Sequence, residues 1–166
     1  MLDSNYIVGF VDGEGCFSIT VNKNGNGTPE VRLLFEIELR EDDQLILNEI
    51  QKALDCGNIY HLEYARYAKW RSHVKYKVSN FSDISRKIIP FFKAHPLRAK
   101  KRFQFEKFCM VAEMMHRKEH LTTQGIEKIE SIRHKDSLDA LDMHVQPQHK
   151  KLGSQQKSVA LGSDRD

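Results

Sequence analysis

The sequence predicts an α+β fold in which pairs of antiparallel strands alternate with helices. Segments 16–22 and 31–40 alternate apolar with polar residues, which is the pattern of half-buried strands. Between them, Asn24-Gly25-Asn26-Gly27 is typical of a β-hairpin turn. A second alternating pair follows at about 58–64 and 70–79. With helices around these pairs the order becomes αββαββα, which favours a sheet with helices on one face.

Helical patterns fill the intervals between the strands. Asp3 or Ser4 can cap a first helix that runs to about Gly13. A second helix is expected over about 43–56, where apolar residues recur at helical spacing. Further helices are expected from residue 80 to an interruption at Pro90, over about 98–118, and from residue 122 or 123 onward.

Length and composition fit one domain, expected at residues 1–141, followed by a polar and flexible tail at 142–166. No run of 18 apolar residues occurs, which excludes a transmembrane helix, and the first residues do not resemble a signal or transit peptide. Cys16, Cys56 and Cys109 are widely spaced and odd in number. They indicate packed thiols in a reducing, intracellular compartment, either an organelle (mitochondrion or chloroplast) or a prokaryotic cytoplasm.

The charge is distributed unevenly along the chain. The net charge is +3, yet residues 66–107 hold 13 Lys or Arg against two acids, a local net of +11, and the remainder of the chain carries −8. Such a block is typical of proteins that bind a polyanion.

The predicted strands leave one polar sheet face, which would suit the major groove of DNA, because that groove admits a two-stranded β-ribbon. Arg and Lys suit guanine edges, Asn suits adenine, and Glu can accept from cytosine. The outward positions, which are also the normal solvent face of any antiparallel sheet, nominate for DNA contact Ser18, Thr20, Asn22, Arg32, Glu36, Glu38, Arg40, Arg71, His73, Lys75 and Lys77.

The segment 6–15, Tyr-Ile-Val-Gly-Phe-Val-Asp-Gly-Glu-Gly, carries the strongest functional signal. Gly9 and Gly13 lie on one face of the first helix and leave it nearly bare, so another helix can approach closely. Asp12 and Glu14 follow at the end of that helix. A carboxylate there is well placed to bind a divalent cation shared with a partner.

Residues 7–15 resemble the nine-residue signature of the LAGLIDADG homing endonucleases, including both glycines and both acids. The resemblance covers about residues 4–135. It implies the αββαββα core, with the antiparallel sheet as a DNA-binding saddle. It also implies a site-specific double-strand DNA endonuclease, intron- or intein-associated, that hydrolyses phosphodiesters with a divalent metal.

By this resemblance, Glu14 occupies the position of the catalytic acid, and the Gly13 carbonyl is a ligand of the same metal. Mg²⁺ is the expected ion, with Mn²⁺ or Ca²⁺ able to occupy the site, and it prefers few carboxylates plus water and phosphate oxygens. For Asp12 a structural role is expected, through hydrogen bonds near the helix end or across the helix pair.

The family also has a basic residue at the start of the helix after the second hairpin, and Lys100 is the best match for it. Arg98 and Lys101 are one-register alternatives and candidate contacts to the DNA backbone. A further family position, often a glutamine that positions water, falls here on Leu39. That departure places direct side-chain positioning of the water in doubt.

A single copy of the signature implies a homodimer, because one motif supplies one carboxylate and cutting two strands needs two sites. Tyr6, Gly9, Asp12 and Gly13 are the expected interface residues, and the target would be long and pseudo-palindromic. Two alternatives stay open: an intron maturase that binds RNA, and a catalytically silent DNA-binding regulator on the same scaffold.

The segment His116-Arg-Lys-Glu-His120 matches a zinc peptidase pattern. No third ligand or enclosed cleft is evident from the sequence, and the match lies at a helix end among charged residues. We interpret it as a chance match on a solvated face.

Overall fold

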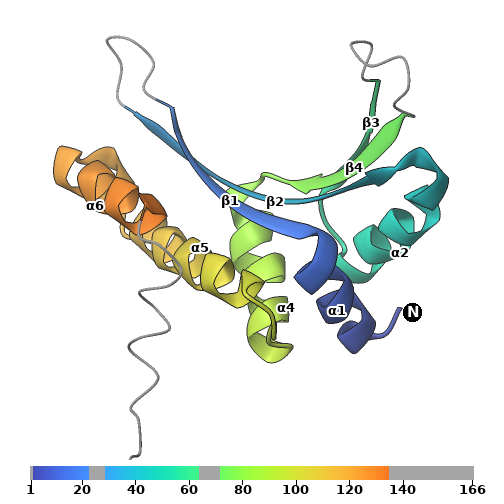
Figure 1. Ribbon diagram of the computed structural model, residues 1–166. Coiled ribbons are helices and arrows are strands. Elements are labelled where there is room, and N and C mark those ends of the chain that lie inside the picture. The colour runs from blue at the N-terminus through green and yellow to red at the C-terminus, as the bar shows by residue number, and fades with distance from the viewer. Residues whose placement is uncertain (1, 23–28, 64–71, 135–166) are drawn as a thin grey trace, which may run out of the picture.

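A four-stranded antiparallel sheet forms one layer of the protein (Figure 1). The computed structural model describes residues 2–22, 29–63 and 72–134. The sheet has the spatial order β1-β2-β4-β3, with strands β1 (Gly15–Asn22), β2 (Glu30–Arg40), β3 (Asn58–Leu62) and β4 (His73–Val78). Every neighbouring pair is antiparallel, as the two predicted hairpins require for β1 with β2 and for β3 with β4.

The helices form the second layer. Short 3₁₀ turns at Glu41–Asp43 and Glu119–Leu121 precede two of them. The helices are α1 (Ser4–Glu14), α2 (Gln44–Leu54), α3 (Phe81–Asp83), α4 (Ile89–Ala94), α5 (Lys101–His116) and α6 (Thr123–His134), and a π-helical segment, η2 (Ile84–Ile88), joins α3 to α4. None of these described helices is long and apolar enough to cross a membrane.

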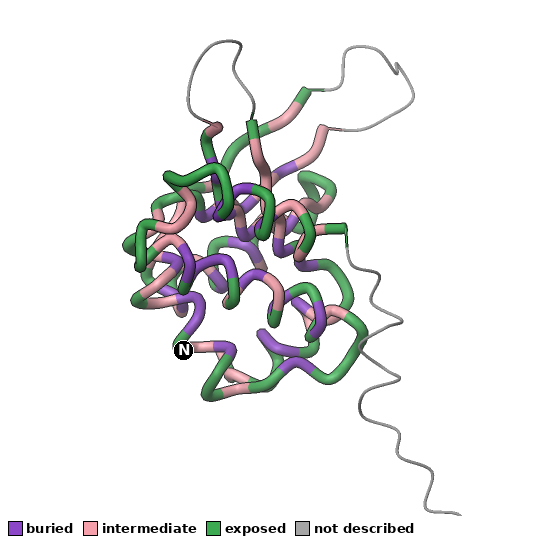
Figure 2. The backbone as a smooth tube through the Cα atoms, turned by 90° about the vertical axis from the view of Figure 1, so that its left-hand side faces the viewer, coloured by how far each residue is buried: buried purple, intermediate pink, exposed green. Residues whose placement is uncertain are grey.

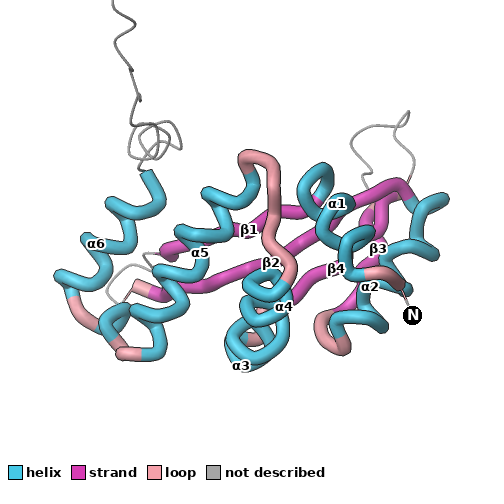
Figure 3. Tube along the Cα trace, turned by 90° about the horizontal axis from the view of Figure 1, so that it is seen from below, coloured by secondary structure: helices cyan, strands magenta, loops and turns pink. Residues whose placement is uncertain are grey.

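The helices lie across one face of the sheet, as the view from the helix side shows (Figure 3). The strands curve away from the helices at both ends of the sheet, so that the opposite face is open and concave (Figure 1). Buried residues concentrate between the two layers (Figure 2). The α+β class and the αββαββα order are therefore confirmed, with the helical course from α3 to α4 as the last helix of that core and with α5 and α6 as additions.

Aromatic rings fill the space between sheet and helices. Phe17 of β1 lies 5.0 Å from Phe35 and 5.4 Å from Phe92, centroid to centroid. On α5, Phe105 and Phe108 lie 5.1 and 5.4 Å from the same ring. These contacts attach α4 and α5 to the sheet because aromatic burial contributes large apolar areas and favours tilted or edge-to-face pairs.

Pro90 does not interrupt its helix, contrary to the sequence prediction. The helical course runs from Phe81 to Ala94 through α3, η2 and α4. Pro90 has no N–H to bond the carbonyl four residues earlier, and the π-helical turn just before it takes up the mismatch, with the Ile89 N–H donating to the Ile84 carbonyl.

The cysteines are free, but their surroundings differ. Burial raises the pKa of the Cys109 thiol to about 11, and burial also raises the pKa of Cys56. Cys16 is exposed instead of packed, because its register in β1 places it opposite Glu36 on the open face.

Several predictions fall outside the described residues. These are the turn at 24–27, Arg71 with the first residues of the predicted 70–79 strand, and the segment 135–166. The domain boundary after residue 141 and the tail at 142–166 therefore stay predictions.

Candidate active site and nucleic-acid interface

Helix α1 positions the acidic end of the motif. The Asp3 carboxylate caps its start by accepting from the backbone N–H groups of Asn5 (2.8 Å) and Tyr6 (3.3 Å). Ile7, Val8 and Val11 are buried against the core, which fixes the rotation of the helix. The remaining face, with Gly9 and Gly13, consequently points away from the chain's own core.

Nothing within the described chain requires glycine at these two positions. A Cβ built on Gly9 or on Gly13 would meet no atom within 4 Å. Glycine inside a helix costs about 0.5–1 kcal/mol relative to alanine, so its presence here weakens the isolated helix. Tyr6, which is 50% exposed, and Phe10 border the same face with ring centroids 6.1 Å apart. The face has the shape that close pairing with a second helix needs.

Gly15 is needed for a different reason. A Cβ there would lie 2.6 Å from the Val11 Cγ1 and 2.9 Å from the Val11 carbonyl oxygen. The close passage lets the chain leave α1 and enter β1 without a connecting loop. Glu14, the last residue of α1, is thereby held at the start of β1.

The Glu14 side chain is exposed, and no hydrogen bond or ion pair engages it within residues 2–22, 29–63 and 72–134. It stands at the C-terminal end of a helix, where the helix dipole disfavours a negative charge. The Gly13 carbonyl, in the last turn, also accepts no hydrogen bond from within the helix. The two oxygen donors suit a divalent cation, and no cluster of three His, Cys, Asp or Glu side chains occurs in the described part of the chain to complete a metal cage.

Asp12 fastens a distant segment to this helix end. Its two carboxylate oxygens accept from the backbone N–H groups of Arg98 (2.8 Å) and Ala99 (3.2 Å). The segment just before α5 is therefore tied to the end of α1 by hydrogen bonds within one chain. This is the structural role expected for Asp12, whereas its part in a dimer interface stays a prediction.

Lys101, the first residue of α5, reaches the end of α1. Its Nζ donates to the Gly15 carbonyl, one residue from Glu14, and its side chain is partly buried. Arg98 and Lys100 are exposed and precede the helix, which begins three residues later than the sequence predicted. The geometry thus favours the one-register alternative, Lys101, for the amine near the acid.

Most of the residues nominated for DNA contact lie on the open sheet face, where several of them form ion pairs with one another. Cross-strand register sets Glu36 beside Lys77 and Glu38 beside Lys75. The Lys75 Nζ lies 3.0 Å from the Glu38 carboxylate and 3.9 Å from that of Glu36, and the Lys77 Nζ lies 3.5 Å from Glu36. The Glu36 side chain is only 19% exposed. We call these four residues the charged lattice.

Other nominated residues lie on the same face. Arg32 pairs with Glu30 (2.8 Å) and Arg40 with Asp42 (2.7 Å). Because directly paired residues share a sheet face, the register also places there Ser18, Thr20, Asn22 and His73.

Sequence reasoning missed several residues of the open face. Cys16 lies beside Glu36, Tyr60 beside Lys75, and Asn58 beside Lys77. Leu34 lies opposite Ser18, at a position where the alternation of β2 predicts a polar side chain. That break in the alternation is the one signal in the sequence that could have singled it out.

The basic block of residues 66–107 does not form one surface. Lys75 and Lys77 belong to the open face, whereas Arg86, Lys87 and Lys93 lie on the helical course under the sheet. There, Lys87 pairs with Asp55 (2.8 Å), and this hydrogen bond lowers the pKa of that carboxyl. Part of the +11 charge therefore faces away from the saddle.

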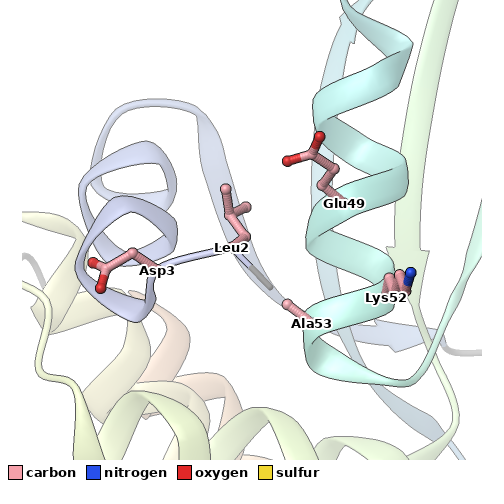
Figure 4. A pocket seen from close by; sticks show the side chains of 5 residues that line it. All are labelled: Leu2, Asp3, Glu49, Lys52 and Ala53. Atoms are coloured by element: carbon pink, nitrogen blue, oxygen red, sulfur yellow. The ribbon is translucent and has the colours of Figure 1, made fainter.

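A hollow of about 640 Å³ opens between the start of α1 and α2, lined by Leu2, Asp3, Glu49, Lys52 and Ala53 (Figure 4). It adjoins the Asp3 end of α1, and Glu14 is 11 residues farther along, a rise of about 16 Å. No lining residue is among the candidate catalytic ones. This hollow is not the candidate active site.

The zinc peptidase pattern is not supported by the helix geometry. Helix α5 ends at His116, Lys118 adopts a left-handed conformation (φ 60°), and His120 lies in the following 3₁₀ turn. The two histidines therefore do not share one helical face, as metal binding by that motif requires.

Known proteins that are similar to this chain agree with the resemblance of residues 7–15 to the LAGLIDADG signature. The sequence model described as LAGLIDADG endonuclease matches residues 7–112. A probable intron-encoded endonuclease 2 of Neurospora crassa is 36% identical over 125 residues, covering 75% of this chain and 25% of that protein.

Two solved structures of I-SmaMI are also similar. Its form bound to cleaved DNA has a TM-score of 0.71 and 30% identity, covering 79% of this chain and 42% of that one. Its form bound to an uncleaved DNA target in the presence of calcium ions has a TM-score of 0.70 and 29% identity, with 79% and 43% covered. This chain thus spans about a quarter of the length of the curated relative and less than half of the I-SmaMI chain.

Proposed function

Because the chain belongs to the LAGLIDADG endonuclease family, we propose that it is a site-specific endonuclease that cuts both strands of an intron insertion site. The observation that carries this proposal is the Glu14 carboxylate at the end of α1, which has no partner among the described residues, with the Lys101 amine bonded to the carbonyl of the next residue, Gly15. The concave sheet face above it supplies a surface for duplex DNA. The name of the Neurospora crassa relative favours an intron over an intein as the host element.

Glu14 and the Gly13 carbonyl are the groups that would hold a divalent metal, with Mg²⁺ as the proposed ion. When bound, such an ion activates water and stabilises the charge on the phosphate. Lys101 presents a cation to the scissile phosphate, in the role that the family resemblance predicted for Lys100. Asp12 keeps the basic segment at 98–101 against the helix end, so the cations and the acid approach the same phosphate.

We further propose that two copies act together, because one chain supplies one Glu14. The bare Gly9/Gly13 face of α1 is the proposed seam, which would bring the two Glu14 side chains together about a two-fold axis. Support comes from the openness of that face, where a Cβ built on Gly9 or Gly13 would meet no atom of the described chain within 4 Å. The corresponding target would be a long, pseudo-palindromic duplex.

Cleavage of a library of candidate insertion-site duplexes in Mg²⁺ tests the function. Wild-type protein should cut a small set of sequences, and Glu14→Gln should cut them at least about a hundredfold more slowly while still binding them. Equal cleavage by Glu14→Gln would refute the mechanism. Binding of intron RNA without DNA cleavage would favour the maturase alternative, and DNA binding without cleavage by wild type would favour the regulator.

A further inference from the structure

Leu34 is one of two partly buried leucines, with Leu62, that the strand register places on the open sheet face. It lies on the open sheet face, and it is partly buried there without packing against the hydrophobic core that the helices cover. Its strand neighbours on that face, Arg32 and Glu36, are charged. A partly buried leucine on a polar face contributes nothing to the core, so the fold does not account for it.

Leu34 lines a hollow in the sheet surface. The hollow has a volume of about 480 Å³ and is formed by side chains from three strands and the residue after β4, including Thr20, Arg32, Lys77 and Ser79. All of these lie on the face opposite the helices. The hollow therefore opens onto the surface proposed to hold DNA.

Four polar or charged side chains near Leu34 already have partners within the protein. Ser18, directly opposite, has its Oγ 3.2 Å from the Cys16 Sγ, and the Thr20 hydroxyl donates to the Arg32 carbonyl at 3.4 Å. The two nearby cations pair with carboxylates, Arg32 with Glu30 and Lys77 with Glu36. The hollow thus presents an apolar group between two cations that are paired with carboxylates, and the Thr20 hydroxyl is bonded within the protein.

Among the groups exposed in the major groove, the thymine 5-methyl is the one that an apolar side chain recognises. We propose, on the premise that the sheet binds target DNA, that Leu34 contacts a thymine methyl and so specifies one T·A pair in each half-site. The flanking cations suit the neighbouring phosphates and base edges. Leu34 lies three residues along β2 from Ile37, and Ile37 pairs with Gly15, the residue after Glu14. The selected thymine therefore lies on the order of 10 Å along the strand from the level of Glu14.

Removal of one methyl group from the DNA tests this contact. Wild-type protein first selects binding duplexes from a randomised library, and each thymine of the selected half-site is then replaced by deoxyuridine. One replacement should weaken binding about fourfold, as expected for loss of one buried methyl. Leu34→Ala should bind the thymine and deoxyuridine duplexes equally, because it has lost the partner of that methyl.

Arg32→Gln is the matched control from the same hollow. It should weaken binding to both duplexes and keep the fourfold ratio between them. If selection succeeds but no deoxyuridine replacement has an effect that depends on Leu34, the proposal is overturned and the endonuclease function stands. If wild type selects no sequence at all, the proposed function itself fails, and the inference with it.

Discussion

The end of α1 and the open sheet face both carry glutamates, but the surroundings of these glutamates differ in exposure and in ion pairing. Glu14 is exposed and has no protein partner within the described residues. Glu36 is 19% exposed and lies within 4 Å of two lysines. A carboxylate without a partner is ready to bind a cation, whereas one between lysines already balances their charge.

The difference indicates a division of labour between chemistry and recognition. In free solution the charged lattice offers few uncompensated cations, so attraction to any duplex is reduced. Contact with the correct base edges would then be needed to replace the internal ion pairs. The end of α1, in contrast, presents the Glu14 carboxylate and, at the carbonyl of the next residue, the Lys101 amine.

The largest effect should come from the amine beside Glu14. Lys101→Ala should slow cleavage by about a hundredfold, because it removes a cation held at the Gly15 carbonyl, one residue from Glu14. Lys100→Ala, an equal change of charge at an exposed position, should slow it far less. Single-turnover cleavage of the selected duplex measures both, and a larger loss for Lys100→Ala would restore the assignment made from sequence.

The glycine face of α1 should separate assembly from stability. Gly9→Ala combined with Gly13→Ala should raise the stability of the isolated chain by up to about 1–2 kcal/mol, because alanine favours the helix and no atom lies within 4 Å of either new Cβ. The same change should weaken pairing of two copies on DNA and reduce cleavage. Thermal unfolding and sedimentation with the target duplex measure the two effects.

Gly15→Ala provides the contrast, because its Cβ would lie 2.6 Å from Val11. It should lower stability, in the opposite direction from the Gly9/Gly13 changes. Unchanged two-copy assembly in the Gly9/Gly13 variant would contradict the proposed seam.

The charged lattice should show its effect in the salt dependence of binding. Glu36→Gln frees Lys75 and Lys77 from one shared partner, so the slope of log K against log salt should steepen by up to about 0.9 per cation gained by DNA. Affinity for unrelated duplexes should rise and discrimination should fall. Glu49→Gln on α2 changes the net charge equally but lies in the hollow beside Asp3, and it should leave the slope nearly unchanged.

The smallest effect concerns the thiols. Cys16 is exposed on the open face and should react with N-ethylmaleimide before the others. Cys109 should react slowly at pH 8, because burial raises its pKa to about 11 and the thiol is therefore protonated at pH 8. Bound target DNA should slow labelling of Cys16 a few-fold and leave Cys109 unaffected, as peptide mass spectrometry can measure. Equal labelling of Cys16 with and without DNA would place the duplex elsewhere.

Short-range patterns predicted the fold well. The alternation in β1, β2 and β4 identified their faces, and caps and periodicity located the helices. The predicted helix break at Pro90 was wrong for a local reason. The missing N–H of proline predicts a break, but the π-helical turn before it accommodates the lost hydrogen bond. The start of α5 was placed too early because the backbone N–H groups of residues 98 and 99 donate to the Asp12 carboxylate, which holds them outside the helix.

The sequence by itself determined the motif, the family resemblance and the acid at Glu14, because these depend on spacing within a few residues. Only the tertiary structure decided which lysine reaches the end of α1, since Gly15 and Lys101 are 86 residues apart in sequence. It likewise decided that Glu36 pairs with Lys77 and that Leu34 lies in a hollow of the saddle. Strand register and helix packing set these contacts, and both are properties of the folded chain that no local stretch of sequence contains.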